Sequence, residues 1–278
     1  MKLKVTPKSI VNHLLMYIYL AISLYPLIYL VFISLKDNTE IFFTNPLGFP
    51  TSLRFYNYFH AVQAFNLPLY FRNSVIVTFT SIVFLLVLSL TFSYAAARLS
   101  WKGSRLASNY VTTGLFIPTQ VILIPLAVLV RDMNIANTHL ALILPYIAFN
   151  LAFSSMIFYV FFRTIPFEIE ESAYIDGASI FRTFLVIMLP LIRPALATVT
   201  IFAFLHIWNE YTISLILITD SSMKTLPTGL LAFTGQFSTD WGPMAAAMVI
   251  ASIPMIIVYL LLGDQVEKAL SMSAAIKG

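Results

Sequence analysis

Long apolar runs, separated by shorter polar stretches, dominate this 278-residue chain. A helix needs about 20 residues to cross about 30 Å of hydrocarbon, and six runs reach that length. Five of the six lack aspartate and glutamate, and the fifth run contains Glu210 near its far end. Only helices or closed barrels satisfy the backbone in lipid, and barrel strands are short and alternating. We therefore predict an all-α integral membrane protein with six transmembrane helices, at 14–35, 73–97, 106–130, 140–162, 191–214 and 242–263.

Composition supports the membrane interpretation and excludes several kinds of site. Hydrophobic residues make up 59% and charged residues 10% of the chain, against about 25% charged residues in soluble domains. The chain has no cysteine, so disulfides, thiolate metal sites and cysteine nucleophiles are impossible. No His, Asp and Glu cluster has the spacing of a metal site, and no Ser-His-Asp arrangement is visible. The net charge of +4 is spread over membrane loops, so no nucleic-acid partner is expected.

Loop charges predict the orientation of the bundle, because cytoplasmic loops carry an excess of lysine and arginine. The first apolar run follows Lys2, Lys4 and Lys8 and is longer than the about 7–15 residues of a signal-peptide core. We therefore expect an uncleaved first helix and both termini in the cytoplasm. With that orientation 11 of the 16 basic residues lie inside, namely Lys2, Lys4, Lys8, Arg98, Lys102, Arg105, Arg163, Arg182, Arg193, Lys268 and Lys277.

The polar segment 164–190 then faces the cytoplasm, and its residues predict a helix–turn–helix. Pro166 suits the first turn of a helix, and the acids Glu168, Glu170 and Glu171 favour a helix N-terminus. Gly177 permits a sharp turn, after which a second helical stretch leads to Pro190 and the fifth apolar run. Such an element, joined to two membrane helices, can transmit motion from a soluble partner.

The same segment has the spacing E-x-A-x3-G-x9-I-x-L-P, formed by Glu171, Ala173, Gly177, Ile187 and Pro190, with Leu189 before the proline. This spacing resembles the EAA loop of the membrane subunits of ATP-driven (ABC) importers. Ser172 stands where the family often has a second alanine, and both residues are small. Other stretches resemble the shorter permease of the carbohydrate-uptake branch, the group of the maltose permease, over nearly the whole chain: Asn73-Ser74, Trp208-Asn209-Glu210-Tyr211, Thr225–Leu230 and Ala274–Gly278.

The resemblance implies a type I ABC importer transmembrane domain that covers residues 1–278 as a single domain in a bacterial or archaeal cell (inner) membrane. It also implies a heterodimer with a second permease subunit, two cytoplasmic ABC ATPase subunits and an extracellular or periplasmic solute-binding protein. The ATPase-coupling residues would be Glu171, Ser172, Ala173, Asp176, Gly177, Ile187, Leu189 and Pro190. None of the nine glycines begins a nucleotide-binding P-loop, so Mg-ATP is expected on the partner ATPase and no cofactor on this chain. Tail contacts are a weaker expectation, because Gly263–Lys268 departs from the family pattern.

Polar residues within the apolar runs are the candidates for the translocation pathway, because polar groups in membrane helices usually serve function. They are Asn150 in the fourth run, and His206, Trp208, Asn209, Glu210 and Tyr211 in the fifth. Aromatic faces beside amides and acids suit a sugar, although tryptophan and tyrosine also fit an ordinary interfacial belt. For Glu210 a second interpretation is a charge at the outer mouth of the pathway, paired within the complex.

The leading interpretation is therefore an importer subunit for a sugar or oligosaccharide, which is not itself an enzyme. The same machinery importing glycerol phosphate or another small polar solute is a second interpretation. A carrier driven by an ion gradient would need acids near the membrane midplane, and the only acid in the runs is Glu210. No catalytic constellation supports a membrane enzyme.

Overall fold

The structure, a computed structural model, describes residues 7–64, 66–235 and 239–275, and in these ranges it is helical, with a single isolated bridge between Thr234 and Thr239. Lys2, Lys4 and the end 276–278 lie outside the described residues. The described chain divides into two compact units, residues 1–68 with 229–253 and residues 69–228 with 254–278. The prediction of one domain over 1–278 stays a prediction.

Unit 1 contains α1 (Pro7–Ser34), a π-helical turn at Glu40–Thr44, α2 (Tyr56–Ala64) and the first part of α13 (Trp241–Ala275). The side chains along α1 are mostly apolar and exposed, as expected of a helix that faces lipid or another protein. Asn57 donates hydrogen bonds to the carbonyls of Ser34 (2.9 Å) and Lys36 (2.8 Å). A Cβ on Gly242 would meet the Lys36 carbonyl at 2.5 Å, so glycine permits this close approach of α13.

A buried lysine and a buried glutamate organise the loop that follows α1. The Lys36 ammonium donates to the carbonyls of Asn45 (2.6 Å) and Gly48 (2.7 Å). The Glu40 carboxylate accepts from the backbone amide of Thr51 at 2.7 Å and from the Asn45 amide at 3.2 Å. Charged groups are costly to bury unless they are paired or hydrogen-bonded, and here both charges hold the loop's backbone in place.

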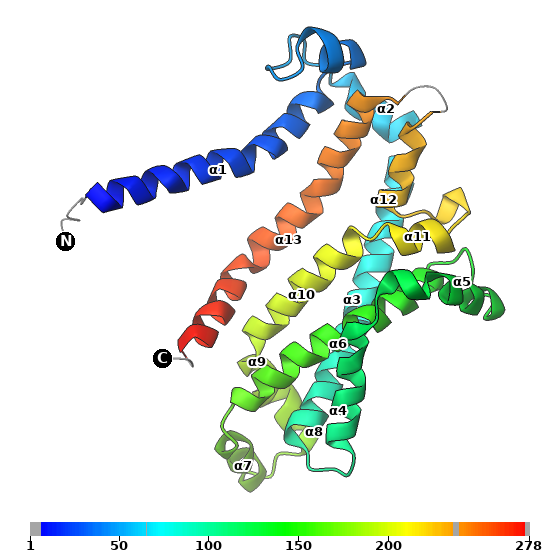
Figure 1. Ribbon diagram of the computed structural model, residues 1–278. Helices are drawn as coiled ribbons and strands as arrows, with labels where there is room; N and C mark the ends of the chain where they lie inside the picture. The colour runs from blue at the N-terminus through cyan, green and yellow to red at the C-terminus, as the bar shows by residue number, and fades with distance from the viewer. Residues whose placement is uncertain (1–6, 65, 236–238, 276–278) are drawn as a thin grey trace. The chain divides into compact units, whose positions relative to one another are not determined.

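Unit 2 carries most of the helices, which Figure 1 labels. They are α3 (Leu67–Arg98, from its third residue), α4 (Ser104–Thr113), α5 (Leu123–Asp132), α6 (Leu140–Thr164), α7 (Glu168–Ile175), α8 (Ile180–Arg182), α9 (Leu189–Leu191), α10 (Arg193–Trp208), α11 (Thr212–Leu217), α12 (Leu226–Gly229, whose last residue belongs to unit 1) and the second part of α13. Short 3₁₀ turns at Gly114–Phe116, Thr119–Ile122, Ser221–Met223 and, in unit 1, Leu230–Phe233, and a π-helical stretch at Thr183–Met188, complete the order.

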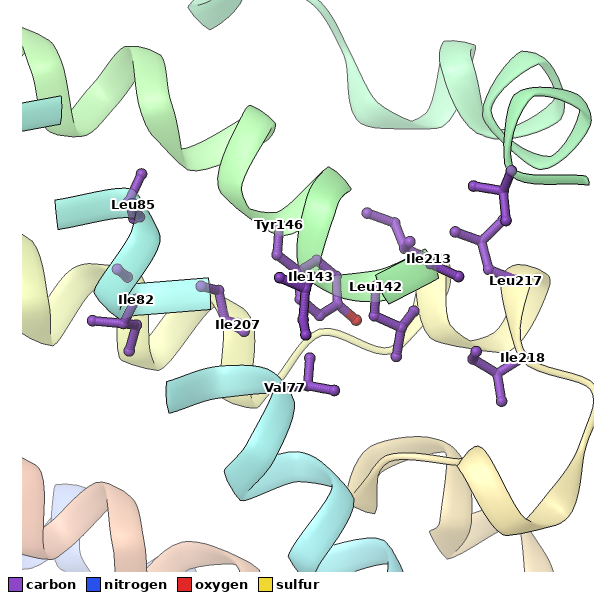
Figure 2. Close-up of a cluster of buried hydrophobic side chains, with 13 residues drawn as sticks. Val77, Ile82, Leu85, Leu142, Ile143, Tyr146, Ile207, Ile213, Leu217 and Ile218 are labelled. Carbon is purple, nitrogen blue, oxygen red and sulfur yellow. The ribbon is translucent and has the colours of Figure 1, made fainter. Parts of the chain in front are cut away.

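Two apolar clusters form the core of unit 2. The first joins α3, α5, α6, α10 and α11; it contains Val77, Leu85, Leu142, Tyr146 and Ile213 (Figure 2). The second joins the other end of α3 to α6, the π-helical stretch and the start of α10, and it contains Phe158, Phe162, Phe184, Met188 and Ile192. Each cluster therefore holds one end of α3 and α6 against the segments that carry the candidate sites.

Four described helices are long and apolar enough to span a membrane, and the number rises to six if each of two bent helix pairs is counted as one span. The four are Ser9–Ser34, Leu67–Arg98, Leu140–Thr164 and Trp241–Gln265, which match the first, second, fourth and sixth expected spans. The pairs are Ser104–Phe116 with Thr119–Asp132, bent by 91°, and Ile180–Leu191 with Arg193–Trp208, bent by 77°. The count of six spans and the cytoplasmic termini stay predictions.

Two expected helices are interrupted. A continuous helix over 106–130 is wrong, because the chain bends at Pro118, which lacks an amide hydrogen and sits in an extended conformation. A continuous helix over 191–214 is also wrong, because α10 ends at Trp208 and α11 begins at Thr212. Pro26, Pro145 and Pro254 lie inside uninterrupted helices, so proline alone does not determine where a helix breaks.

Acidification should remove the contribution of Glu40 to unit 1. The Thr51 amide holds the pKa of the Glu40 carboxyl below its ordinary value. A carboxyl with a lowered folded-state pKa stabilises the fold fully above its unfolded pKa of about 4.3, and this contribution is lost as the pH falls through the lowered value. We expect Glu40→Gln to lower the melting temperature at pH 7, and the difference from wild type to shrink as the pH falls below the unfolded pKa of about 4.3.

The exposed carboxylate of Glu168 provides the matched control, because Glu168→Gln should shift the melting temperature little at any pH. A difference between Glu40→Gln and wild type that stays constant from neutral to acid pH would contradict the role of the Glu40 charge.

Candidate coupling loop and translocation cavity

The segment 164–190 folds as the predicted helix–turn–helix. Pro166 precedes α7, and Glu168, Glu170 and Glu171 occupy its first turn. Gly177 has φ +76° and nothing lies within 4 Å of a Cβ built on it, so the backbone conformation alone requires glycine. The Ser179 side chain accepts from the Arg182 amide at 3.3 Å and caps α8, from which helical turns lead to Pro190.

The predicted coupling residues divide into an outer and an inner set. Ala173 is buried, and its carbonyl accepts from the Ala178 amide at 2.9 Å across the turn. Ile187 and Leu189 are half-buried at the root of the segment. The exposed members are Glu171, Ser172, Asp176, Gly177 and Pro190. The motif therefore combines residues that hold the turn together with residues available to a partner.

Large apolar side chains also stand exposed on this segment. Ile175 is 86% exposed at the end of α7, and Phe181 is 71% exposed on α8. Ile180 and Val186 are exposed as well. Several exposed apolar residues on one polar loop are typical of a protein-binding surface.

A buried ion pair that the sequence analysis missed fixes this segment to α3. Arg98, the last residue of α3, binds the Glu170 carboxylate through both Nε and Nη2, and the two side chains are 0% and 5% exposed. Tyr94, one turn earlier on α3, donates its hydroxyl to the other carboxylate oxygen at 2.8 Å. The sequence analysis placed Arg98 among the cytoplasmic basic residues and Glu170 among the acids that favour a helix N-terminus, and it did not pair them. A usable signal was the i, i+4 spacing of Tyr94 and Arg98 on one helix face.

The remaining donors of Arg98 satisfy the end of α6. Its Nη1 donates to the carbonyls of Ile165 (2.8 Å) and Phe162 (3.2 Å), and Nη2 reaches the Pro166 carbonyl at 3.3 Å. The guanidinium also lies 3.7 Å from the centroid of the Phe167 ring. Helix C-termini leave carbonyls without partners, so one side chain closes α6 and positions α7. We call Tyr94, Arg98 and Glu170 the clamp.

Four of the six predicted pathway residues line one cavity of about 360 Å³ in unit 2. They are His206, Asn209, Glu210 and Tyr211. The other lining residues are Thr119, Gln120, Leu123, Leu205, Thr212 and Ile213. We call it the polar cavity. It lies where both broken helices are interrupted, because non-helical backbone at these breaks brings polar side chains together.

The other two predicted residues lie elsewhere. Trp208 is buried, with its ring stacked on Phe204 and edge-on to Phe71. Asn150 is buried in α6, and its amide donates to the Tyr146 carbonyl at 2.7 Å. Neither is among the residues lining the polar cavity.

Glu210 has a local structural role. Its carboxylate accepts from the backbone amides of Ile213 (2.8 Å) and Ser214 (3.2 Å), in the first turn of α11. The Tyr146 hydroxyl donates to the same carboxylate at 2.7 Å. Glu210 therefore caps α11, and three donors already occupy its oxygens. Asn209 and Tyr211 are exposed beside it.

Residues 89–272 match the family model described as "Binding-protein-dependent transport system inner membrane component". This match covers more than half of the chain and includes the clamp, the segment 164–190 and the residues of the polar cavity. The chain belongs to this family. The resemblance to ABC import permeases is therefore confirmed, and the chain is a transport component rather than a catalyst.

Several members of the family are similar over most of their length. The diacetylchitobiose uptake system permease protein NgcG of Streptomyces coelicolor is 33% identical over 94% of this chain and 87% of its own. The trehalose/maltose transport system permease protein MalG of Thermococcus litoralis is 31% identical, with 92% of each chain covered. A chain in the crystal structure of a bacterial ABC transporter for alginate import superimposes with a TM-score of 0.79 at 22% identity, covering 92% of this chain and 95% of that one. This last likeness shows the fold.

Breaking the clamp on one side should destabilise the protein strongly. Arg98→Met leaves the Glu170 carboxylate buried without its cation, and removing one partner of a buried pair costs about 3–5 kcal/mol. Adding Glu170→Leu removes the stranded charge, so the double variant should recover a large part of that loss. The measurement is the free energy of unfolding in detergent.

Arg182→Met, which removes an exposed arginine on α8, is the matched control and should change that free energy by less than about 0.5 kcal/mol. If the effects of Arg98→Met and Glu170→Leu simply add in the double variant, the two residues do not form the coupled pair described above.

Proposed function

We propose that this chain is one permease subunit of an ATP-driven, binding-protein-dependent importer for a sugar or oligosaccharide. It forms half of the translocation pathway and couples to cytoplasmic ATPase subunits through the segment 164–190. The observation that carries the proposal is this segment: a helix–turn–helix with the Glu171–Pro190 spacing, an exposed apolar surface and a root held by the clamp.

A stiff root and an exposed tip are what a coupling element needs. The buried pair of Arg98 and Glu170 joins α7 to the end of α3, so a force on α7 is carried into a long membrane helix. The exposed Ile175 and Phe181 offer apolar area to an ATPase groove. Mg-ATP would bind that partner, because this sequence contains no P-loop.

The full assembly would contain a second permease subunit, two ATPase subunits and an extracellular or periplasmic solute-binding protein, in a bacterial or archaeal cell (inner) membrane. The family description, which names binding-protein-dependent transport and an inner membrane component, supports this assembly. A structural neighbour of this chain comes from an alginate transporter in complex with an alginate-bound periplasmic protein, with a TM-score of 0.65.

Sugar cargo is favoured over an anionic solute such as glycerol phosphate. Relatives are named for diacetylchitobiose and for trehalose and maltose. The polar cavity offers amide, hydroxyl and aromatic groups, and no lysine or arginine is among its described lining residues. A phosphate-bearing cargo would require fixed positive charge along the route. Competition of uptake by unlabelled sugars and by glycerol phosphate separates the two classes.

Gly177→Pro should abolish transport without preventing membrane insertion. Proline fixes φ near −65°, which conflicts with +76°, and it removes the amide that donates to the Tyr174 carbonyl at 3.0 Å. Gly177→Asn is the matched control, because asparagine adopts the left-handed conformation more readily than other residues. We expect binding-protein-stimulated ATP hydrolysis and uptake to disappear in the proline variant and largely persist in the asparagine variant.

The assay begins with purification through a tag on this chain, where an ATPase, a second permease and a binding protein should copurify. Normal uptake by the proline variant would exclude the coupling role. Recovery of this chain alone, in a detergent that preserves other complexes, would favour a carrier driven by an ion gradient.

Alanine variants at Glu210 and at its neighbours should distinguish a residue that contacts the substrate from one that stabilises the fold. Asn209→Ala and Tyr211→Ala remove exposed groups of the polar cavity, so they should weaken uptake at low substrate concentration and leave the melting temperature nearly unchanged. Glu210→Ala removes the cap of α11, and lost caps cost about 0.5–2 kcal/mol, so it should lower the melting temperature. Unchanged uptake kinetics in Asn209→Ala and in Tyr211→Ala would place the substrate route on the partner permease.

A further inference from the structure

A second and larger cavity, of about 970 Å³, lies between α4 and α6 beside the end of α3. None of its lining residues belongs to the polar cavity near Glu210. Ser104, Arg105, Ser108 and Asn109 of α4 face it, and so do Ser155, Tyr159 and Arg163 of α6. It has no part in the coupling or pathway roles proposed above, and we call it the basic cavity.

The charge of the basic cavity suits an anion. Arg105 and Arg163 line it, and no aspartate or glutamate is among its described lining residues. The Arg163 Nη1 donates to the Tyr159 hydroxyl at 3.2 Å, and its guanidinium lies 5.9 Å from the Tyr159 ring centroid. Neither arginine has an acidic partner among the ion pairs of the described residues. Guanidinium groups match the oxygens of phosphate in two-pronged hydrogen bonds.

Two buried hydroxyl groups in the wall have no hydrogen-bond partner. Ser155 is only 3% exposed, and its side-chain Oγ has no hydrogen-bond partner. Its backbone carbonyl accepts from the Ser93 hydroxyl at 2.8 Å. The Oγ of Ser108 on the facing helix is likewise unpaired. Buried polar groups in folded proteins nearly always have partners, and each exception calls for an explanation. A ligand with oxygen acceptors would satisfy both.

The depth and the remaining walls point to an amphipathic ligand. Ser155 and Arg163 are eight residues apart on α6, about 12 Å along the helix axis. Phe92, Val111 and Met156 add apolar wall. At the charged end, Trp101 and Tyr159 line the cavity, and such aromatic residues favour the level of lipid headgroups. Charge at one end and apolar surface farther in match a phospholipid better than a small soluble anion.

We propose that the basic cavity binds the phosphate-bearing headgroup of an anionic phospholipid. Arg105 and Arg163 hold the phosphate, Ser108 and Ser155 donate to the ester oxygens below it, and an acyl chain follows the apolar wall. Basic pockets between membrane helices are a general means of binding such headgroups. A soluble organic phosphate presents the same recognised group and is the alternative source.

Lipid binding to the purified transporter complex tests the proposal. Native mass spectrometry would count phosphatidylglycerol retained during titration, with phosphatidylcholine, a zwitterionic lipid without net charge, as the comparison. We expect Arg105→Gln/Arg163→Gln to lower the affinity for phosphatidylglycerol about 10- to 30-fold, the loss expected for two basic groups at a membrane surface. Lys102→Gln is the matched control, because it removes a neighbouring charge that does not line the cavity, and it should leave binding unchanged.

Equal losses in the double variant and in Lys102→Gln would overturn the site in favour of general surface charge. Glycerol 3-phosphate and inorganic phosphate, titrated in place of lipid, distinguish the sources. If they bind with the same arginine dependence and phosphatidylglycerol does not, the phosphate site stands and its assignment to lipid is wrong. Failure of all three to bind overturns both.

A photoreactive phosphatidylglycerol on the wild-type complex gives a second test that needs no variant. Label concentrated in peptides from 104–113 and 155–163 supports the proposal, and label spread evenly over α1 and α13 contradicts it. Because neither readout measures transport, failure of the proposed function and failure of this site are distinguishable.

Discussion

The buried pair of Arg98 and Glu170 is the interaction on which the functional end of unit 2 depends. Two charges removed from water are costly unless every donor and acceptor is satisfied, and here they are satisfied from three elements. The Tyr94 hydroxyl donates a further hydrogen bond to the carboxylate, and the guanidinium donates its remaining hydrogen bonds to carbonyls at the end of α6. The same contacts that make burial tolerable also fix the direction in which α7 leaves the membrane helices. The same set of contacts therefore both satisfies the buried charges and makes the attachment of the segment 164–190 rigid.

The sequence predicted those parts of the fold that depend on local signals. The length of the apolar runs located four spans that the structure retains as long helices. Pro166, the acids of the first turn and Gly177 predicted the helix–turn–helix, because each acts on its own backbone. The pairing of Arg98 with Glu170 in the clamp could not be predicted from such local signals. Arg98 and Glu170 are 72 residues apart, and each has the neighbours of an ordinary solvated charge.

The breaks in the two interrupted helices show why the lining of the polar cavity was only partly predictable. Pro118 ends one helical stretch, whereas Pro145 lies within continuous α6, so the outcome depends on the packing around each proline. Glu210 was predicted as a charge at the mouth of the pathway or as part of its lining. It lines the polar cavity, and it also caps α11, a helix that exists only because α10 stops at Trp208. A capping role cannot be inferred before the break that creates the helix is known.

The bend at Pro118 has a consequence for how this kind of protein can change its cargo. Non-helical backbone at membrane depth is tolerated only where it contacts protein or lines water, and Thr119 and Gln120, just after the bend, border the polar cavity. On the proposed route, the main chain at the bend contributes polar groups that side-chain substitutions do not remove. Side chains around the polar cavity can therefore change to fit another cargo while this contribution of the main chain stays.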